Sequence, residues 1–162
     1  MTTYRDLYQK AQADSEGFWL DAAKSIDWVT PPTRALDASN PPFSRWFPDG
    51  ELNTCYNAVD RHVAAGCGDR KAIIYDSPIT DSASTMSFSD LQTATARFAG
   101  MLTRLGINKG DRVIIYMPMI PQSLVAMLGC ARLGAVHSVV FGGFAAAELA
   151  KRIDDAQPKA II

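Results

Sequence analysis

A pair of adjacent glycines is the feature of this sequence that most directly indicates a ligand-binding site. Gly142 and Gly143 lie between an apolar run that predicts a strand, Val136–Phe141, and a segment that predicts a helix, Ala146–Asp155. Glycines let a ligand approach the backbone closely, and the free amides at the start of a helix attract an anion such as phosphate. The spacing therefore predicts an anion-binding loop after the strand, where ligands of open α/β sheets bind.

The alternative is a tight turn that serves folding alone, with Phe141 and Phe144 packed into the core. On spacing alone this alternative is favoured, because the chain contains no complete phosphate-binding signature. There is no G-x-x-x-x-G-K-[ST] segment and no G-x-G-x-x-G segment after a strand. The two interpretations stay open at this stage.

The histidines and serines give weaker signals. His137 lies in an apolar strand, where a hydrogen-bonded core histidine is favoured over a general base. His62 lies on a predicted helix, where a hydrogen bond at the surface or between segments is favoured. Ser123 and Ser138 have no base at a readable spacing, so a hydrolase triad has no support.

Composition excludes several classes of protein. The 162 residues include 16 Lys plus Arg and 17 Asp plus Glu, so the net charge of −1 offers no basic surface for nucleic acid or anionic membrane. Cys55, Cys67 and Cys130 are odd in number and form no C-x-x-C pair, which argues against a disulfide framework and a zinc site. We expect a cytoplasmic protein with no nucleic-acid partner, no membrane partner and no metal ligands.

Two helices are predicted at the start of the chain. Thr3 and Asp6 resemble a capping box for a helix over Tyr4–Ala13, and Ser15 is the expected cap of the second helix. The second helix should bury one apolar stripe, formed by Phe18, Trp19, Ala22 and Ile26.

Residues 27–50 predict an irregular arm, because five prolines each remove an amide donor and favour extended backbone. Trp28, Phe43, Trp46 and Phe47 offer large apolar areas, so we expect the arm to be pinned by packing. We predict that residues 1–52 form a helical and Pro/aromatic region that packs onto the body of the chain, which residues 53–162 begin.

The body is expected to open with a helix from Asn53 to about Ala65, stopped by Gly66 or Gly68. Lys71–Asp76 then predicts a strand, and Thr85–Phe88 can return antiparallel to it.

A long amphipathic helix follows, with Ser89 as its expected cap and Gly106 as the positive-φ residue that ends it. Its predicted apolar positions are Leu91, Ala94, Phe98, Met101, Leu102 and Leu105.

From Val113 the pattern alternates between strand and helix. Val113–Met117 is an apolar β-branched run, and Pro121 suits the first turn of a helix that ends at Gly134. After the strand and helix that flank the glycine pair, Lys159–Ile162 opens one more strand. The fold class expected is α/β: an incomplete parallel, doubly wound sheet. The bare final strand predicts that the chain is the front part of something longer.

Long ordered motifs show a resemblance to a known family. The chain closely resembles the N-terminal part of short-chain, AMP-forming acyl-CoA synthetases, and is most similar to the propionyl-CoA synthetase (propionate–CoA ligase) branch. The similarity covers essentially all residues. It includes PPFSRWF at Pro41–Phe47, LNTCYNAVDRH at Leu52–His62, GDRVIIYMPMIP at Gly110–Pro121, CARLGAVHSVVFGGF at Cys130–Phe144 and RIDDAQPKAII at Arg152–Ile162.

The resemblance implies two half-reactions. A carboxylate, here propionate, attacks the α-phosphate of ATP with help from Mg²⁺, giving an acyl-adenylate and pyrophosphate. The CoA thiol then displaces AMP. In the family the phosphate loop, the acidic residue for magnesium, the acyl pocket and the adenylation lysine all follow the segment that matches these 162 residues, so no catalytic residue and no metal ligand carries over.

One cofactor-binding element does carry over. In the acetyl- and propionyl-CoA synthetase branch the FGG of this loop lies along the nucleotide part of CoA, and Phe141, Gly142 and Gly143 match it. The rest of the match resembles scaffold. We therefore expect the piece alone to be inactive, to bind no cofactor tightly, and to self-associate through its unpaired strand edge.

Two alternatives remain open. The chain could instead be an independent, non-catalytic α/β interaction module derived from such an enzyme. Within the ligase interpretation, acetate is the alternative substrate, since the residues that size the acyl pocket are absent.

Overall fold

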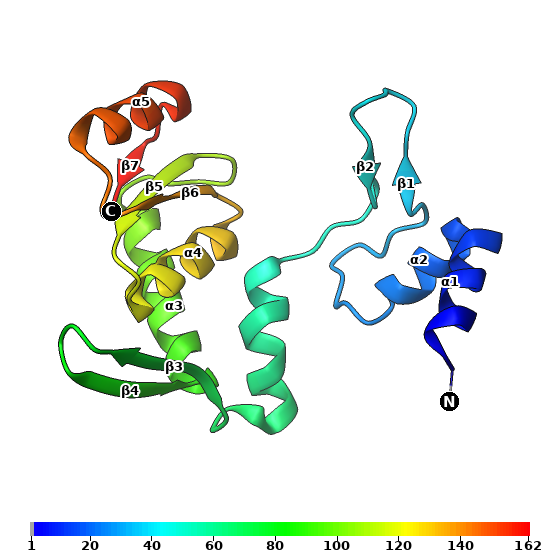
Figure 1. The fold of residues 1–162 in the computed structure, drawn as a ribbon, viewed down its shortest axis with the longest axis horizontal. Coiled ribbons are helices and arrows are strands. Elements are labelled where there is room, and N and C mark those ends of the chain that lie inside the picture. Colours follow the sequence, from blue (N-terminus) through cyan, green and yellow to red (C-terminus); the bar gives the residue numbers. More distant parts are fainter. Residues whose placement is uncertain (1) are drawn as a thin grey trace. The chain divides into compact units, whose positions relative to one another are not determined.

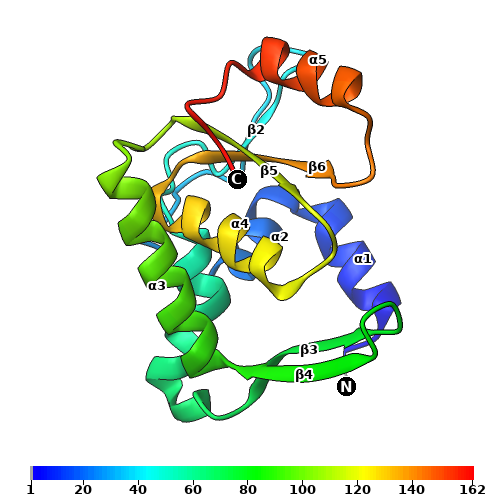
Figure 2. The same ribbon diagram turned by 90° about the vertical axis from the view of Figure 1, so that its left-hand side faces the viewer.

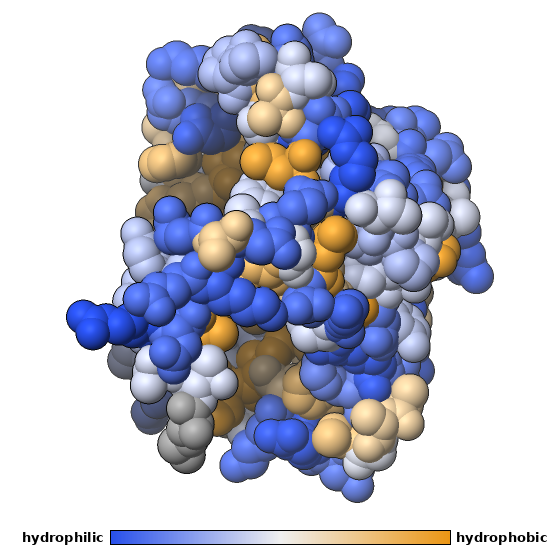
Figure 3. All heavy atoms as spheres, turned by 90° about the vertical axis from the view of Figure 1, so that its right-hand side faces the viewer, coloured by the Kyte–Doolittle hydropathy of each residue, from blue (hydrophilic) through white to orange (hydrophobic). Residues whose placement is uncertain are grey.

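The computed structural model describes residues 2–162, which divide into two compact units, residues 2–53 and Thr54–Ile162 (Figure 1). We call them unit 1 and unit 2. Figure 3 shows one face of the molecule, on which hydrophilic residues predominate and hydrophobic residues form small separate groups. Among the described residues no helix is both long enough and apolar enough to cross a membrane.

Unit 1 begins with two short helices. α1, Tyr4–Ala13, has the predicted capping box between Thr3 and Asp6. α2, Ser15–Ala23, is capped by Asp14, whose carboxylate accepts the Gly17 amide at 2.9 Å. The expectation that Ser15 caps α2 was wrong: Ser15 is already helical, and the preceding carboxylate is an equally good acceptor for the free amides of the first turn.

The arm after α2 is mostly irregular, as predicted. Its one ladder among the described residues joins β1, Leu36–Asp37, to β2, Arg45–Trp46, antiparallel, and a single antiparallel bridge joins Thr30 to Glu51. The predicted apolar stripe was wrong at two positions, since Trp19 is 40% exposed and Ala22 is exposed, and the buried residue at the end of α2 is Ala23. Packing of this region onto the rest of the chain stays a prediction.

Unit 2 opens with a helical run of π type, η1 over Tyr56–Asp60 and η2 over Val63–Cys67. Gly66 has φ +81 and ends the helical geometry, as predicted. A hairpin follows, with β3, Lys71–Ser77, antiparallel to β4, Ser82–Ser87. β4 begins before the predicted Thr85, because Ser82, Ala83 and Ser84 also pair with β3, and it ends at Ser87, since Phe88 is already helical.

The long helix α3, Phe88–Arg104, is capped by Ser87 and not by Ser89. The Ser87 hydroxyl accepts the Asp90 amide at 3.1 Å, and the Asp90 carboxylate accepts the Ser87 amide in return. This capping box needs an acidic residue three positions after the cap, which the pair Ser87 and Asp90 supplies. Gly106 follows α3 with φ +80, as predicted.

The rest of unit 2 alternates strand and helix: β5 Arg112–Met117, α4 Pro121–Leu133, β6 Val136–Phe141, α5 Ala146–Ala156 and β7 Ala160–Ile161. The three strands are parallel in the order β6-β5-β7. Both ribbon views place α5 on one side of this sheet and α3 with α4 on the other (Figures 1 and 2). The chain therefore has the predicted α/β fold with a parallel sheet between helical layers.

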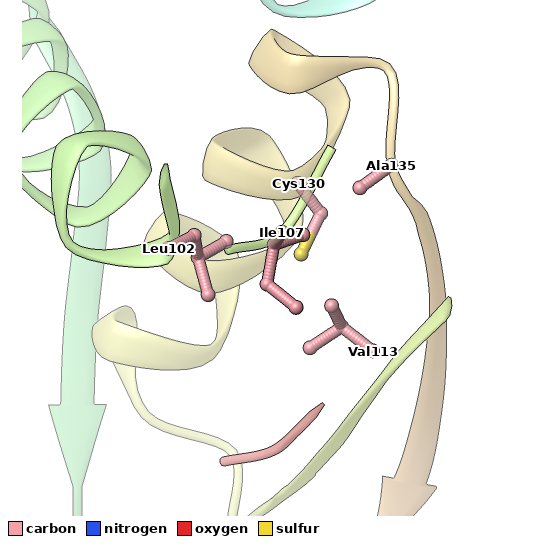
Figure 4. Packing of buried hydrophobic residues seen from close by; sticks show 5 residues of the cluster. All are labelled: Leu102, Ile107, Val113, Cys130 and Ala135. Carbon is pink, nitrogen blue, oxygen red and sulfur yellow. The ribbon is translucent and has the colours of Figure 1, made fainter. Parts of the chain in front are cut away.

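The core of unit 2 lies between this sheet and its helices. Figure 4 shows Leu102 of α3, Cys130 of α4 and Val113 of β5 converging, together with Ile107 and Ala135 from the adjoining loops. A second cluster, around Val59, Leu91 and Val125, lies between η1, α3 and α4.

Candidate functional site

The loop Phe141–Phe144, which we call the FGGF loop, leaves the carboxyl end of β6. Phe141 is paired with Met117, so the loop lies beside the carboxyl end of β5. The Phe144 amide donates to the Phe141 carbonyl at 3.0 Å and closes a tight turn before α5. Two chain exits thus meet at the edge of the sheet where such folds bind ligands.

Gly142 is required by a close backbone approach. A Cβ atom at this position would lie 3.0 Å from the Met117 carbonyl carbon and 3.0 Å from the Pro118 nitrogen. Both neighbours are backbone and cannot rotate away. The residue is therefore glycine because β6 leaves the sheet against the end of β5, and not because φ is positive.

Gly143 has a softer constraint. Its Cβ would lie 2.6 Å from Cε1 of the Phe141 ring, which is a movable side chain. A larger residue at this position would thus displace the ring of Phe141. Gly142 is therefore required for folding, whereas Gly143 leaves room for the side chain of Phe141.

The two phenylalanines of the loop are not core residues in this chain. Phe141 is 59% exposed and Phe144 is 39% exposed, and their rings meet edge to face with centroids 5.8 Å apart. The interpretation in which both pack into the core was therefore wrong. β6 is an edge strand of the observed sheet, and the two rings belong to its last residue and to the loop that follows it.

The N-terminus of α5 has mixed features for an anion. Ala145 occupies the cap position and provides no side chain to its free amides. Glu148 lies in the first turn, where its charge opposes a bound anion, but its carboxylate is engaged with Lys151 at 2.7 Å and Arg152 at 4.0 Å. The loop therefore presents two exposed aromatic rings, and the helix terminus beside them gives only partial support for an anion. That Phe141, Gly142 and Gly143 bind a nucleotide stays a prediction.

The histidines and Ser123 have no catalytic arrangement. His137 is exposed, so its assignment to the core was wrong; β6 is an edge strand of the sheet that residues 2–162 form. His62 is half-buried, with its ring 5.2 Å from that of Phe88. The Ser123 hydroxyl donates to the Ile120 carbonyl at 2.8 Å, within the first turn of α4.

A partly buried polar network was not foreseen from the sequence. Asp60 of η1 accepts from Arg132 of α4 at 2.8 and 2.9 Å and from Gln92 of α3 at 2.8 Å. Asp60 and Arg132 are 72 positions apart, so no local pattern connects them. The network joins three segments around the second core cluster, which is a scaffold role.

Cys55, beside this network, and Cys130, in the first core cluster, are buried free thiols. Burial raises the pKa of Cys55, and the neighbouring Arg132 guanidinium only partly opposes the shift. Burial also raises the pKa of Cys130. Neither thiol is thus activated as a nucleophile or ligand. Within residues 2–162 no three His, Cys, Asp or Glu side chains lie together as a metal site would need.

Comparison with protein families gives two matches. The family described as AMP-binding enzyme matches residues 59–162, and the family described as acetyl-coenzyme A synthetase N-terminus matches residues 4–58. Together they cover nearly the whole described chain.

Curated relatives match along the same length. The chain is 50% identical over 159 residues to "Acyl-CoA synthetase short-chain family member 3, mitochondrial" of Mus musculus, which covers 98% of the chain and 23% of that protein. It is 52% identical to the "Acetyl-coenzyme A synthetase" of Streptomyces avermitilis over 97% of the chain and 24% of that protein. A similarly named protein of Thiobacillus denitrificans is 52% identical over all of the chain and 25% of its own length. The chain thus spans about a quarter of these relatives.

Proposed function

The chain belongs to the family of AMP-binding enzymes, and from this premise we propose that it is the N-terminal segment of an AMP-forming short-chain acyl-CoA synthetase. The complete enzyme would join a small carboxylate to CoA with consumption of ATP, through an acyl-adenylate. The observation that carries the proposal is the unbroken match of both units, at about half identity, to proteins named for this activity.

The role proposed for this chain is to supply part of the CoA site. The exposed ring of Phe141, which lies against Gly143, offers an apolar face to the nucleotide part of CoA. ATP and Mg²⁺ would be held by residues outside this chain. We propose that the chain by itself is inactive, and that it self-associates through β6 and β7, where Val136, Val139 and Ile161 are exposed.

Propionate is the carboxylate that we propose first, because CYNAVDRH at 55–62 and the segment after the FGGF loop resemble the propionate branch. Acetate is equally supported, since two of the relatives above are named acetyl-coenzyme A synthetase. The cytoplasm stays the proposed compartment, although the name of the mouse relative places that protein in mitochondria.

The test begins with the complete reading frame. Continuation past Ile162 into a glycine-rich Ser/Thr loop supports the ligase, and a stop codon there supports an independent module. The complete gene product is then assayed for carboxylate-dependent ATP–pyrophosphate exchange and for thioester formation, with kcat/KM compared for propionate and acetate. We expect exchange with at least one of them. A complete product that shows no carboxylate-dependent exchange would contradict the proposal.

A further inference from the structure

Arg152 of α5 lies over the aromatic pair of the FGGF loop. Its guanidinium carbon is 4.9 Å from the centroid of the Phe144 ring. The Phe144 ring in turn meets the Phe141 ring edge to face. A cation over the face of a ring attracts it and restricts its orientation. The side chains therefore form a chain of contacts from α5 to the exposed ring of Phe141.

Phe144 is also held through its backbone. The Tyr116 hydroxyl, at the end of β5, donates to the Phe144 carbonyl at 2.8 Å. The backbone of Phe144 is thus latched to the central strand, and Arg152 contacts its ring. Because both the backbone and the ring of Phe144 are fixed, the exposed ring of Phe141 has a fixed aromatic neighbour.

We propose that Arg152 is a positioning residue for the nucleotide end of CoA, acting through Phe144 to orient the Phe141 ring. The proposal rests on the proposed function and adds a residue to it. Because preorganising an aromatic side chain reduces the entropy lost on binding, the effect should appear in the affinity for the nucleotide and not in adenylation.

Lys151 provides the matched control. It is the neighbouring cation on α5, and it pairs with the same carboxylate, Glu148, at 2.7 Å. The substitutions R152Q and K151Q therefore remove the same charge from the same helix and the same ion-pair partner. Only Arg152 contacts an aromatic ring, so a difference between the two variants isolates that contact.

The experiment uses the complete gene product and three readouts: the KM for CoA, the Ki of adenosine 3′,5′-bisphosphate as a probe of the nucleotide end, and carboxylate-dependent ATP–pyrophosphate exchange. We expect R152Q to raise the KM and the Ki about two- to fivefold, the size of effect that an exposed cation–π contact supports. K151Q should change neither, R152K should restore part of the loss, and exchange should stay unchanged in all three.

A double-mutant cycle decides whether Arg152 acts through Phe144. In an F144L background R152Q should have no further effect on the Ki, because the ring that it orients is gone. An equal effect in both backgrounds would mean that Arg152 contacts the nucleotide directly and would overturn the proposal, as would an R152Q variant with unchanged Ki. F141A separates this result from the proposed function: if F141A also leaves the Ki unchanged, the loop binds no nucleotide at all.

Discussion

The two units of the molecule are stabilised in different ways. Among the described residues of unit 1 only two alanines, Ala23 and Ala35, are buried, whereas unit 2 has fully buried Leu, Ile and Val side chains in two clusters. Unit 1 relies on contacts between aromatic rings. The ring centroids of Trp19 and Trp46 are 5.2 Å apart, and those of Trp28 and Phe47 are 5.4 Å apart. The comparison shows that one short chain can combine an arm held by surface contacts with a body held by a packed core.

Carboxylates fix the backbone of the arm in unit 1. Glu16 of α2 accepts the Ala35 amide at 2.6 Å, and Asp49 accepts the Thr33 amide at 2.9 Å. These bonds replace the ladder that a strand would supply, since the prolines of the arm leave few amides for regular pairing. The stability of the arm should therefore depend on pH, and the stability of unit 2 should fall when a substitution creates a cavity in its core.

The largest effect is expected from a cavity in the core of unit 2. Leu102→Ala should lower the free energy of unfolding by about 2–5 kcal/mol, because Leu102 is fully buried among β5, α3 and α4. The control is Leu105→Ala, on a residue that is 62% exposed. Urea unfolding followed by far-UV circular dichroism measures both. Equal losses would mean that unit 2 does not have the core described.

The comparison of Leu102 with Leu105 also shows what the sequence could predict. Apolar periodicity predicted α3 to α5 and the parallel strands correctly, because the helices bury one face and the strands are covered on both faces. It could not separate Leu102 from Leu105, since the boundary of the buried face depends on where α4 and β5 cross α3. At the site it predicted the loop but not the exposure of its rings, the backbone contact of Gly142, or the pair Asp60–Arg132, all of which depend on residues far apart in sequence.

The glycine pair should give the next largest effect. Gly142→Ala places a methyl group against the backbone of Met117 and Pro118, and should lower the free energy of unfolding by about 1–3 kcal/mol. Gly143→Ala meets only the Phe141 ring, which can rotate, so its loss should be much smaller. The same unfolding measurement compares the two. A larger loss for Gly143→Ala would reverse the roles assigned to them.

A smaller effect is expected at the start of α3. Ser87→Ala removes the cap and should cost about 1 kcal/mol of stability. Ser89→Ala, two positions later, should change stability by less than about 0.5 kcal/mol, because its side chain does not cap the helix. Thermal unfolding of the two variants measures this difference, and a greater loss for Ser89→Ala would contradict the observed cap.

The smallest effect is expected from acid, and it should appear in unit 1. Hydrogen bonds from Ser39, with help from Arg45, hold the pKa of Asp37 at about 2 instead of 3.8, and Thr33 lowers the pKa of Asp49. A carboxylate whose pKa is lowered in the folded state stabilises the unit at pH values above its unfolded-state pKa. This stabilisation is lost as the pH falls through the folded-state pKa. The arm should therefore loosen between about pH 4 and pH 2.

Fluorescence isolates this change, because all three tryptophans, Trp19, Trp28 and Trp46, lie in unit 1. We expect tryptophan emission to shift in this range before the far-UV signal of α3, α4 and α5 is lost. Unit 2 has two carboxylates with lowered pKa as well, but neither belongs to its two hydrophobic core clusters. Simultaneous loss of both signals would show that the two units do not differ in this way.

The central claim is that the FGGF loop serves the CoA half-reaction, and the substitution Gly143→Val in the complete gene product tests it most directly. The valine would displace the Phe141 ring and fill the space along the backbone. We predict weaker CoA binding and slower thioester formation, with carboxylate-dependent ATP–pyrophosphate exchange near normal. An equal fall in exchange and thioester formation would show that the loop is a folding element, and no change in either would show that no ligand lies close to Gly143.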